Sequence, residues 1–112
     1  MRSIRRDTQF KKDVKRLVKR SKDLNKLKKV IRCLVRAEKL PAENKDHQLK
    51  GILKDCRECH IEPDWLLIYR IEGSELCLVR TGSHSDLSIN MLPGYDSEEF
   101  GEKVFSKRYC SR

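Results

Sequence analysis

Apolar residues in the first forty positions recur every three to four residues, which is the spacing of an amphipathic helix. Two such stripes are present: Phe10, Val14, Leu17 and Val18, then Leu24, Leu27, Ile31 and Leu34. The first predicts a helix over about 9–19, capped by Asp7 or Thr8, and the second a helix over about 24–40, capped by Asp23. Pro41 ends the second helix, and the short connection at 21–23 makes the two helices an antiparallel hairpin.

Later in the chain, apolar and β-branched residues form runs that are typical of strands. The runs 65–71 and 76–81 flank a glycine-containing turn at 72–75 and predict a β-hairpin. A run over about 52–61, ended by Pro63, predicts a third strand, and the charged segment 4–8 predicts a short edge strand. The polar segment 41–51 predicts a loop.

The run 65–71 has apolar residues on both faces, as expected for a central strand that is covered on one face by helices. The sequence therefore predicts an α+β fold in which the helix hairpin packs on a small antiparallel sheet. Periodicity is lost after Leu87, so we expect one domain over residues 1–88 and a C-terminal extension over 89–112. Within the extension, 98–106 fits a short helix or an irregular segment equally well.

Charge is concentrated at the start of the chain. The net charge is +9, yet residues 1–40 alone carry sixteen Lys and Arg against four acidic residues, a net +12. Such an excess predicts binding to nucleic acid or to an acidic protein. No apolar run is long enough to span a membrane and no signal peptide is evident, so we expect a cytoplasmic protein. Five irregularly spaced cysteines argue against a disulfide framework.

The three histidines of the chain each lie in a polar segment. His47 falls in the predicted loop, His60 and Asp64 lie on the two sides of Pro63, and His84 follows the last predicted strand. These strand ends and the loop can meet at one edge of the sheet. Imidazole side chains gathered there could take up and release protons near neutral pH. The alternative interpretation is structural: His60 and Asp64 pair at a turn and His84 is a surface histidine.

Cleavage of RNA by its own 2′-hydroxyl needs a base, an acid and cations for the phosphorane charge. His47, His60, Asp64 and His84 can supply the proton transfers, and Arg80 and Arg57 can bind the anion. The run Cys56-Arg57-Glu58-Cys59-His60 also matches a haem-attachment pattern and offers zinc ligands. Covalent haem needs export, an apolar pocket and a second axial ligand, and this sequence offers little of these, so we do not expect haem. Neighbouring strand residues point to opposite faces, which disfavours zinc. We expect no cofactor and no metal.

The order and spacing of these segments resemble the YafQ-like branch of the RelE/ParE toxin superfamily. The matching segments are Lys45-Asp46-His47, the run from Arg57 to Tyr69, and the run from Leu78 to Leu87. The resemblance implies a RelE-like microbial ribonuclease fold and a toxin of a type II toxin-antitoxin system. It implies a metal-independent mRNA interferase that cuts mRNA in the ribosomal A site and is silenced by a cognate acidic antitoxin.

The resemblance also implies roles for individual residues. His84 is the leading candidate for the general acid; His47, His60 and Asp64 contribute base, positioning or substrate contacts. Arg80, Arg57, Lys45 and Trp65 are the expected substrate-binding residues. The family commonly has an aromatic residue where this chain has Ser88, which predicts altered nucleotide placement. The alternative to an RNase is a toxin of this fold without RNase activity, acting as a topoisomerase inhibitor or only as an antitoxin-binding protein.

Overall fold

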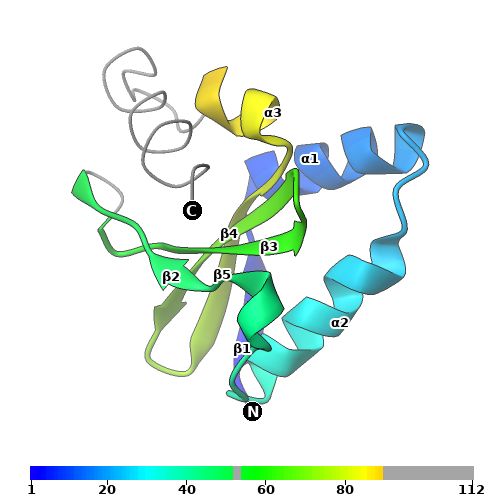
Figure 1. The fold of residues 1–112 in the computed structure, drawn as a ribbon. Coiled ribbons are helices and arrows are strands. Elements are labelled where there is room, and N and C mark those ends of the chain that lie inside the picture. The colour runs from blue at the N-terminus through cyan, green and yellow to red at the C-terminus, as the bar shows by residue number, and fades with distance from the viewer. Residues whose placement is uncertain (52–53, 90–112) are drawn as a thin grey trace.

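Two helices cover one face of a five-stranded sheet (Figure 1). The computed structural model describes residues 1–51 and 54–89. In chain order the strands are β1 (Ser3–Arg6), β2 (His47–Gln48), β3 (Arg57–Glu62), β4 (Trp65–Glu72) and β5 (Glu75–Gly82). The helices are α1 (Thr8–Lys19), α2 (Leu24–Val35) and α3 (His84–Ile89), and a 3₁₀ turn, η1, spans Ala42–Asn44. The order across the sheet is β1-β5-β4-β3-β2.

The predicted α+β class is confirmed, but the sheet is mixed rather than wholly antiparallel. Strands β2 to β5 pair antiparallel, whereas β1 lies parallel to β5, with Ile4 opposite Leu76. A parallel pair needs a long crossover connection. The helix hairpin and β2 to β4 supply that connection, so the predicted edge strand joins the sheet beside the last strand of the chain.

The core fills the space between the helix hairpin and the sheet. Helices α1 and α2 contribute the predicted apolar stripes except for Val18, which is 55 % exposed, and alternate residues of the central strands meet them. The buried members of this cluster are Phe10, Leu17, Leu27, Val30, Leu34, Leu40, Cys59, Trp65, Leu67, Tyr69, Leu76 and Leu78. Residues of β3 and β4 between these positions face the opposite side of the sheet, which is where the histidines collect.

Helix α2 ends at Val35, earlier than the predicted Leu40. The Ala37 backbone takes the left-handed conformation (φ 58°), the Glu38 N–H donates to the Cys33 carbonyl at 3.0 Å, and the Ala37 N–H donates to the Leu34 carbonyl at 3.1 Å. This is a Schellman ending, which usually has glycine at the left-handed position. Because alanine stands there instead, no glycine marks the end of the helix before Pro41.

The segment around the predicted third strand also differs from expectation. Strand β3 begins at Arg57, and the two-residue strand β2 lies in what the sequence predicts to be a loop. Residues 52–53 and the C-terminal extension from residue 90, including the possible helix at 98–106, lie outside the described residues. None of the described helices is long and apolar enough to cross a membrane.

Candidate active site

Asp64 and His84 form a close pair at one end of the sheet. Asp64 lies in the turn between β3 and β4, and His84 is the first residue of α3. The β4–β5 register places Leu66 opposite Gly82, so the two segments emerge side by side. One carboxylate oxygen, Asp64 Oδ1, accepts the backbone N–H of His84 at 3.0 Å and also contacts its ring Nδ1. The Asp64 turn and the His84 segment therefore meet at one edge of the sheet, as predicted.

This contact fixes the direction of the His84 ring. When Nδ1–H donates to a carboxylate, the ring turns Nε2 away from its partner and toward any substrate. Partial burial alone would raise the pKa of Asp64, but the hydrogen bonds from the His84 backbone and ring outweigh it and lower that pKa. Asp64 is thus ionised across the neutral range. The arrangement is that of an acid/base histidine oriented by a carboxylate.

The first turn of α3, which carries His84, is held in place by a capping box. The Ser83 N–H donates to Asp86 Oδ2 at 3.0 Å, and the Asp86 N–H donates to Ser83 Oγ at 3.2 Å. Arg20, at the end of α1, donates to both Asp86 oxygens at 2.7 and 3.1 Å and holds the pKa of Asp86 well below its usual range. A Cβ on Gly82 would lie 2.9 Å from Asp86 Oδ2, so only glycine fits at this junction.

His60 lies beside His84. The two ring centroids are 6.0 Å apart at an interplanar angle of 58°. Burial lowers the pKa of His60, and the positive charges of His84 and His47 lower it further, against the opposing effects of Glu58 and the Pro63 carbonyl. A neutral imidazole can accept a proton, so His60 suits the role of a base. Its backbone carbonyl accepts the Asn44 side-chain N–H at 2.7 Å, which ties β3 to η1.

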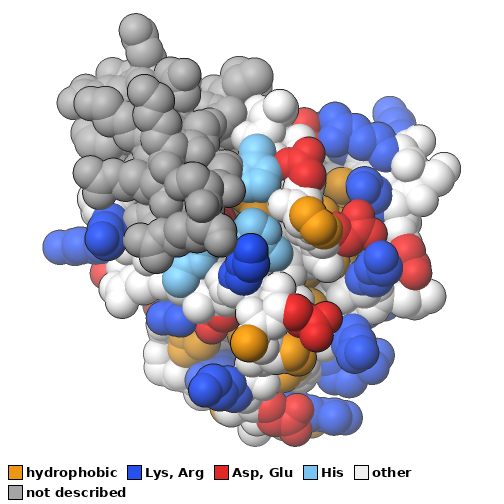
Figure 2. Space-filling view, in the orientation of Figure 1, with side chains coloured by type: hydrophobic (Ala, Val, Ile, Leu, Met, Phe, Trp, Pro, Cys, Tyr) orange, Lys and Arg blue, Asp and Glu red, His pale blue; other side chains and the backbone are white. Residues whose placement is uncertain are grey.

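His47 completes the group from strand β2. Its Nδ1 lies 2.7 Å from the Lys45 carbonyl, and its Nε2 lies 3.4 Å from Glu58 Oε1. Lys45 has a left-handed backbone (φ 49°) that turns the chain into β2. Figure 2 shows the pale blue histidine side chains gathered on one face of the molecule. The structure therefore brings together all four of the predicted proton-transfer residues.

The predicted substrate-binding residues have other partners. Arg80 is 1 % exposed, and its guanidinium donates Nε to Asp13 Oδ2 at 2.7 Å and Nη2 to Asp13 Oδ1 at 3.1 Å. Arg57 donates to both oxygens of Asp46 at 3.2 Å. These two bonds use two of the five N–H donors of each guanidinium and fix its plane. Carboxylates therefore orient the two arginines.

Trp65 does not lie where a substrate-stacking residue would. Its side chain is buried in the helix-facing core, and its Nε1–H donates to Thr81 Oγ1 at 2.9 Å. Thr81 in turn donates to the Leu66 carbonyl at 2.7 Å, so the indole fastens β4 to β5. A fully buried indole is not accessible for stacking on a nucleotide base. Ser88 falls in the last turn of α3, and its side chain lies outside the described part of the chain.

Sequence reasoning missed the carboxylates beneath the site. Two of them bind arginines: Asp13 binds Arg80, and Asp46 binds Arg57. Glu58 lies beside His47, and Asp86 caps the first turn of α3. For Asp13 there was a signal, because it lies on the apolar stripe of α1, three residues from Phe10. Asp46 also accepts the Tyr69 hydroxyl at 2.6 Å; burial and this bond raise the pKa of Tyr69.

In the described part of the chain, no cysteine shares a candidate metal site with a histidine. Cys59 lies in the core, where burial raises the pKa of its thiol, while its neighbour His60 faces the site. Among the described residues, one group of ligand atoms lies within coordinating distance of one another: Glu72, Glu75 and Cys77. It lies at the β4–β5 turn, at the far end of these strands from Asp64. The zinc interpretation of the CxxCH run therefore has no support in this geometry.

Comparison with known proteins gives consistent matches. Residues 2–89 match the model of a family described as "Bacterial toxin of type II toxin-antitoxin system, YafQ". The mRNA interferase toxin YafQ of Escherichia coli is 46 % identical over 87 residues, which cover 77 % of this chain and 95 % of that protein. In the E. coli DinJ-YafQ complex, the matched chain has a TM-score of 0.73 at 45 % identity, covering 78 % of this chain and 98 % of that one. A metal-bound toxin from Helicobacter pylori has a TM-score of 0.74 at 49 % identity, covering 78 % and 99 %.

Proposed function

Because the chain belongs to the YafQ family of bacterial type II toxins, we propose that it is an mRNA interferase that cleaves mRNA in the ribosomal A site. The observation that carries this proposal is the Asp64–His84 pair with a neutral His60 ring 6.0 Å from that of His84. An oriented imidazole beside an unprotonated one suits general acid/base catalysis at a phosphodiester. Such a reaction takes place where ribosomes translate, in the cytoplasm.

In the proposed mechanism, the 2′-hydroxyl of the RNA attacks its own 3′-phosphate. His60 takes the proton of the hydroxyl, because its lowered pKa keeps it neutral. His84 donates a proton from Nε2 to the departing 5′-oxygen, and Asp64 holds the ring in that direction. The products are a 2′,3′-cyclic phosphate and a free 5′-hydroxyl, and no step requires a metal.

The experiment that tests this function follows a translated message in a purified translation system. Primer extension on the message is expected to reveal new 5′ ends inside translated codons with the wild-type protein. The His84→Ala variant should give none of these ends. If wild type and variant both arrest growth without cleaving RNA, the chain is a toxin of this fold with another target, such as a topoisomerase.

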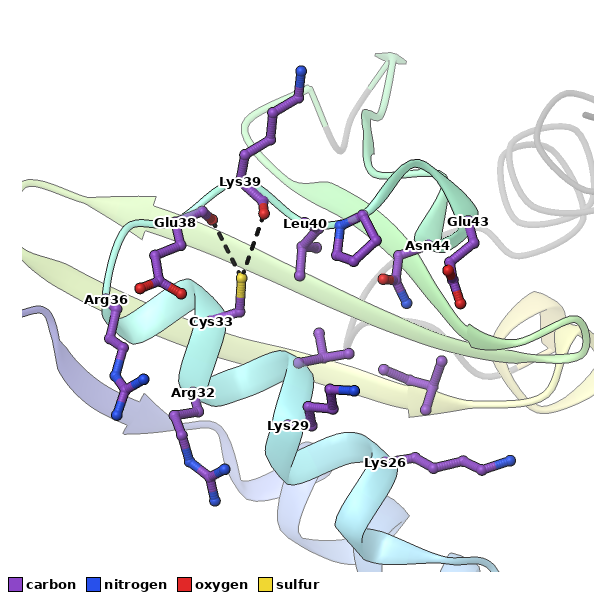
Figure 3. Close-up of a pocket in the computed structure, with 13 residues that line it drawn as sticks. Lys26, Lys29, Arg32, Cys33, Arg36, Glu38, Lys39, Leu40, Glu43 and Asn44 are labelled. Atoms are coloured by element: carbon purple, nitrogen blue, oxygen red, sulfur yellow. Dashed lines mark hydrogen bonds between the residues drawn. The ribbon is translucent and has the colours of Figure 1, made fainter.

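We also propose that a cognate acidic antitoxin binds the basic groove beside α2. This groove has a volume of about 720 Å³, and Figure 3 shows the side chains that line it along α2 and the segment before η1. Apolar Val30, Leu40 and Ile61 line its inner side. Its cations are Lys26, Lys29, Arg32, Arg36 and Lys39. Charge and shape together suit an acidic amphipathic segment, and the E. coli relative forms a complex with DinJ.

Charge reversal in the groove tests this partner. The double variant Lys29→Glu/Arg32→Glu should weaken binding of the small acidic product encoded beside this gene by at least about 10-fold in calorimetry. Lys11→Glu/Lys12→Glu, on the exposed face of α1, is the matched control and should bind normally. Equal loss in both variants would show general charge attraction in place of docking in the groove.

A further inference from the structure

We propose that Arg20, at the end of α1, is a positioning residue for His84: through the carboxylate of Asp86 it fixes the β5–α3 junction that directs the His84 ring. The effect of Arg20 on catalysis rests on the proposed ribonuclease function. The orientation of the ring can be measured without any RNA. The proposal makes helix α1, and not the sheet alone, responsible for the geometry of the catalytic pair.

The first step of the argument is a stripe of charged side chains on α1 and its C-cap, formed by Asp13, Arg16 and Arg20. Their spacing of three and four residues places them on one face of the helix. Arg16 Nη1 lies 3.6 Å from Asp13 Oδ1 and 3.6 Å from Asp86 Oδ1, so Arg16 stands between two carboxylates. The stripe therefore links the buried aspartate of α1 to the aspartate of α3.

The second step is that this stripe holds both sides of the β5–α3 junction. On the strand side, Asp13 Oδ2 accepts the Thr81 backbone N–H at 3.1 Å. On the helix side, Arg20 donates to both oxygens of Asp86 at 2.7 and 3.1 Å, and Figure 1 shows α3 beside α1. Only two residues separate Thr81 from His84. A single helix thus fixes the chain immediately before and after the catalytic histidine.

The third step concerns the partner of His84 in the site. Asp64 accepts hydrogen bonds from the backbone and the ring of His84, yet its own side chain is 70 % exposed. So exposed a carboxylate on a turn is a weak anchor, because solvent competes for it. The position of the His84 ring must then be set from the α3 side. There, the Asp86 side chain is only 13 % exposed and binds Arg20 and the Ser83 N–H together.

The fourth step compares the effect on stability with the effect on geometry. The Arg20 side chain is 45 % exposed, and ion pairs of exposed groups add little to the stability of a fold. The paired N–H donors of a guanidinium nevertheless fix the plane and direction of the carboxylate that they bind. Catalysis is sensitive to small displacements of the reacting groups. Loss of Arg20 should therefore affect the His84 ring more than the stability of the fold.

The test compares wild type with Arg20→Gln by NMR of the His84 ring nitrogens in the full-length protein, at a pH high enough to make the ring neutral. The wild type is expected to show one tautomer, with the hydrogen on Nδ1, because the ionised Asp64 can only accept. Arg20→Gln should show a mixture of both tautomers. Lys19→Gln, which removes the same charge from the neighbouring exposed residue, is the matched control and should match the wild type.

Cleavage kinetics on a programmed ribosome complex supply the second readout. Arg20→Gln should lower kcat by roughly 3- to 10-fold with little change in KM, because the group that is displaced takes part in the chemical step. Arg20→Lys keeps the charge but not the two-pronged geometry, so its kcat should lie between those of Arg20→Gln and the wild type. If Arg20→Gln does not fold, Arg20→Lys carries the test.

Two results would overturn the inference. One is a variant of Arg20 that folds and keeps both the single His84 tautomer and the wild-type kcat, even if its melting temperature falls. The other is a rise in KM alone with the ring unchanged, which would make Arg20 a cation that binds RNA. A His84 ring that responds as expected, in a protein that never cleaves RNA, would instead overturn the proposed function and leave the positioning role in place.

Discussion

Replacing Asp64 with asparagine tests how much of the activity depends on orienting His84. Asparagine keeps the size of the side chain and one acceptor oxygen. It removes the negative charge from the group that accepts hydrogen bonds from the backbone N–H and the ring Nδ1–H of His84. A hydrogen bond to a charged group contributes about 1.5–3 kcal/mol, and solvent screening favours the lower half of that range because the Asp64 side chain is 70 % exposed. At about 1.4 kcal/mol for each factor of ten, Asp64→Asn should slow cleavage by roughly 10- to 40-fold.

The rate of message cleavage at pH 7.5, measured by primer extension in a purified translation system, gives this loss directly. Asp55→Asn, an exposed aspartate in the loop before β3, is the control and should cleave at the wild-type rate. The lowered pKa of Asp64 stabilises the fold above pH ~4, and that stabilisation disappears as the pH falls through the folded-state value. Little change in melting temperature is expected, since the side chain is largely exposed. Wild-type cleavage by Asp64→Asn would refute the orienting role.

Four further predictions follow from the same geometry. The acidic limb of the pH–rate profile should have its midpoint below 6.5, because burial lowers the pKa of His60 and the neutral ring is the base; a midpoint above 6.5 contradicts this assignment. Gly82→Ala should lower both the melting temperature and the cleavage rate, because its Cβ would lie 2.9 Å from Asp86 Oδ2. Asp13→Asn should destabilise the fold by about 3–5 kcal/mol in urea unfolding, since it leaves the buried Arg80 without its counterion. Protein that is dialysed against EDTA and then returned to the Mg²⁺-containing translation system should cleave at the untreated rate, and a loss of activity that an added transition metal restores would contradict the metal-independent mechanism.

Much of the scaffold could be predicted because its signals are local. The stripes at Phe10 and Leu24 define two helices, and Asp23 caps the second as expected by accepting the Asn25 N–H at 3.0 Å. The apolar runs on the two sides of the 72–75 turn correctly predicted the β4–β5 hairpin. The order of elements also predicted that His84, after the last strand, lies at the same edge of the sheet as Asp64, but it did not predict that the two side chains pair.

The features that could not be predicted from the sequence depend on contacts between residues that are distant in the chain. Asp13 and Arg80 are 67 residues apart in the chain, so the place of Asp13 on the apolar stripe of α1 indicates burial but does not identify its partner. The left-handed backbone at Ala37 is set by the tertiary packing of α2 and not by glycine. The pairing of His47 with Glu58 depends on β2, a strand too short to produce alternation.

The central claim is that an oriented His84 carries out ribosome-dependent cleavage of mRNA. The most direct measurement is toe-printing of a translated message with the wild-type protein and with His84→Ala, both checked for native fold and for antitoxin binding. We expect cleavage inside codons in the A site with the wild type, and a loss of at least about 10²-fold with the variant. Equal cleavage by the two folded proteins would contradict the account.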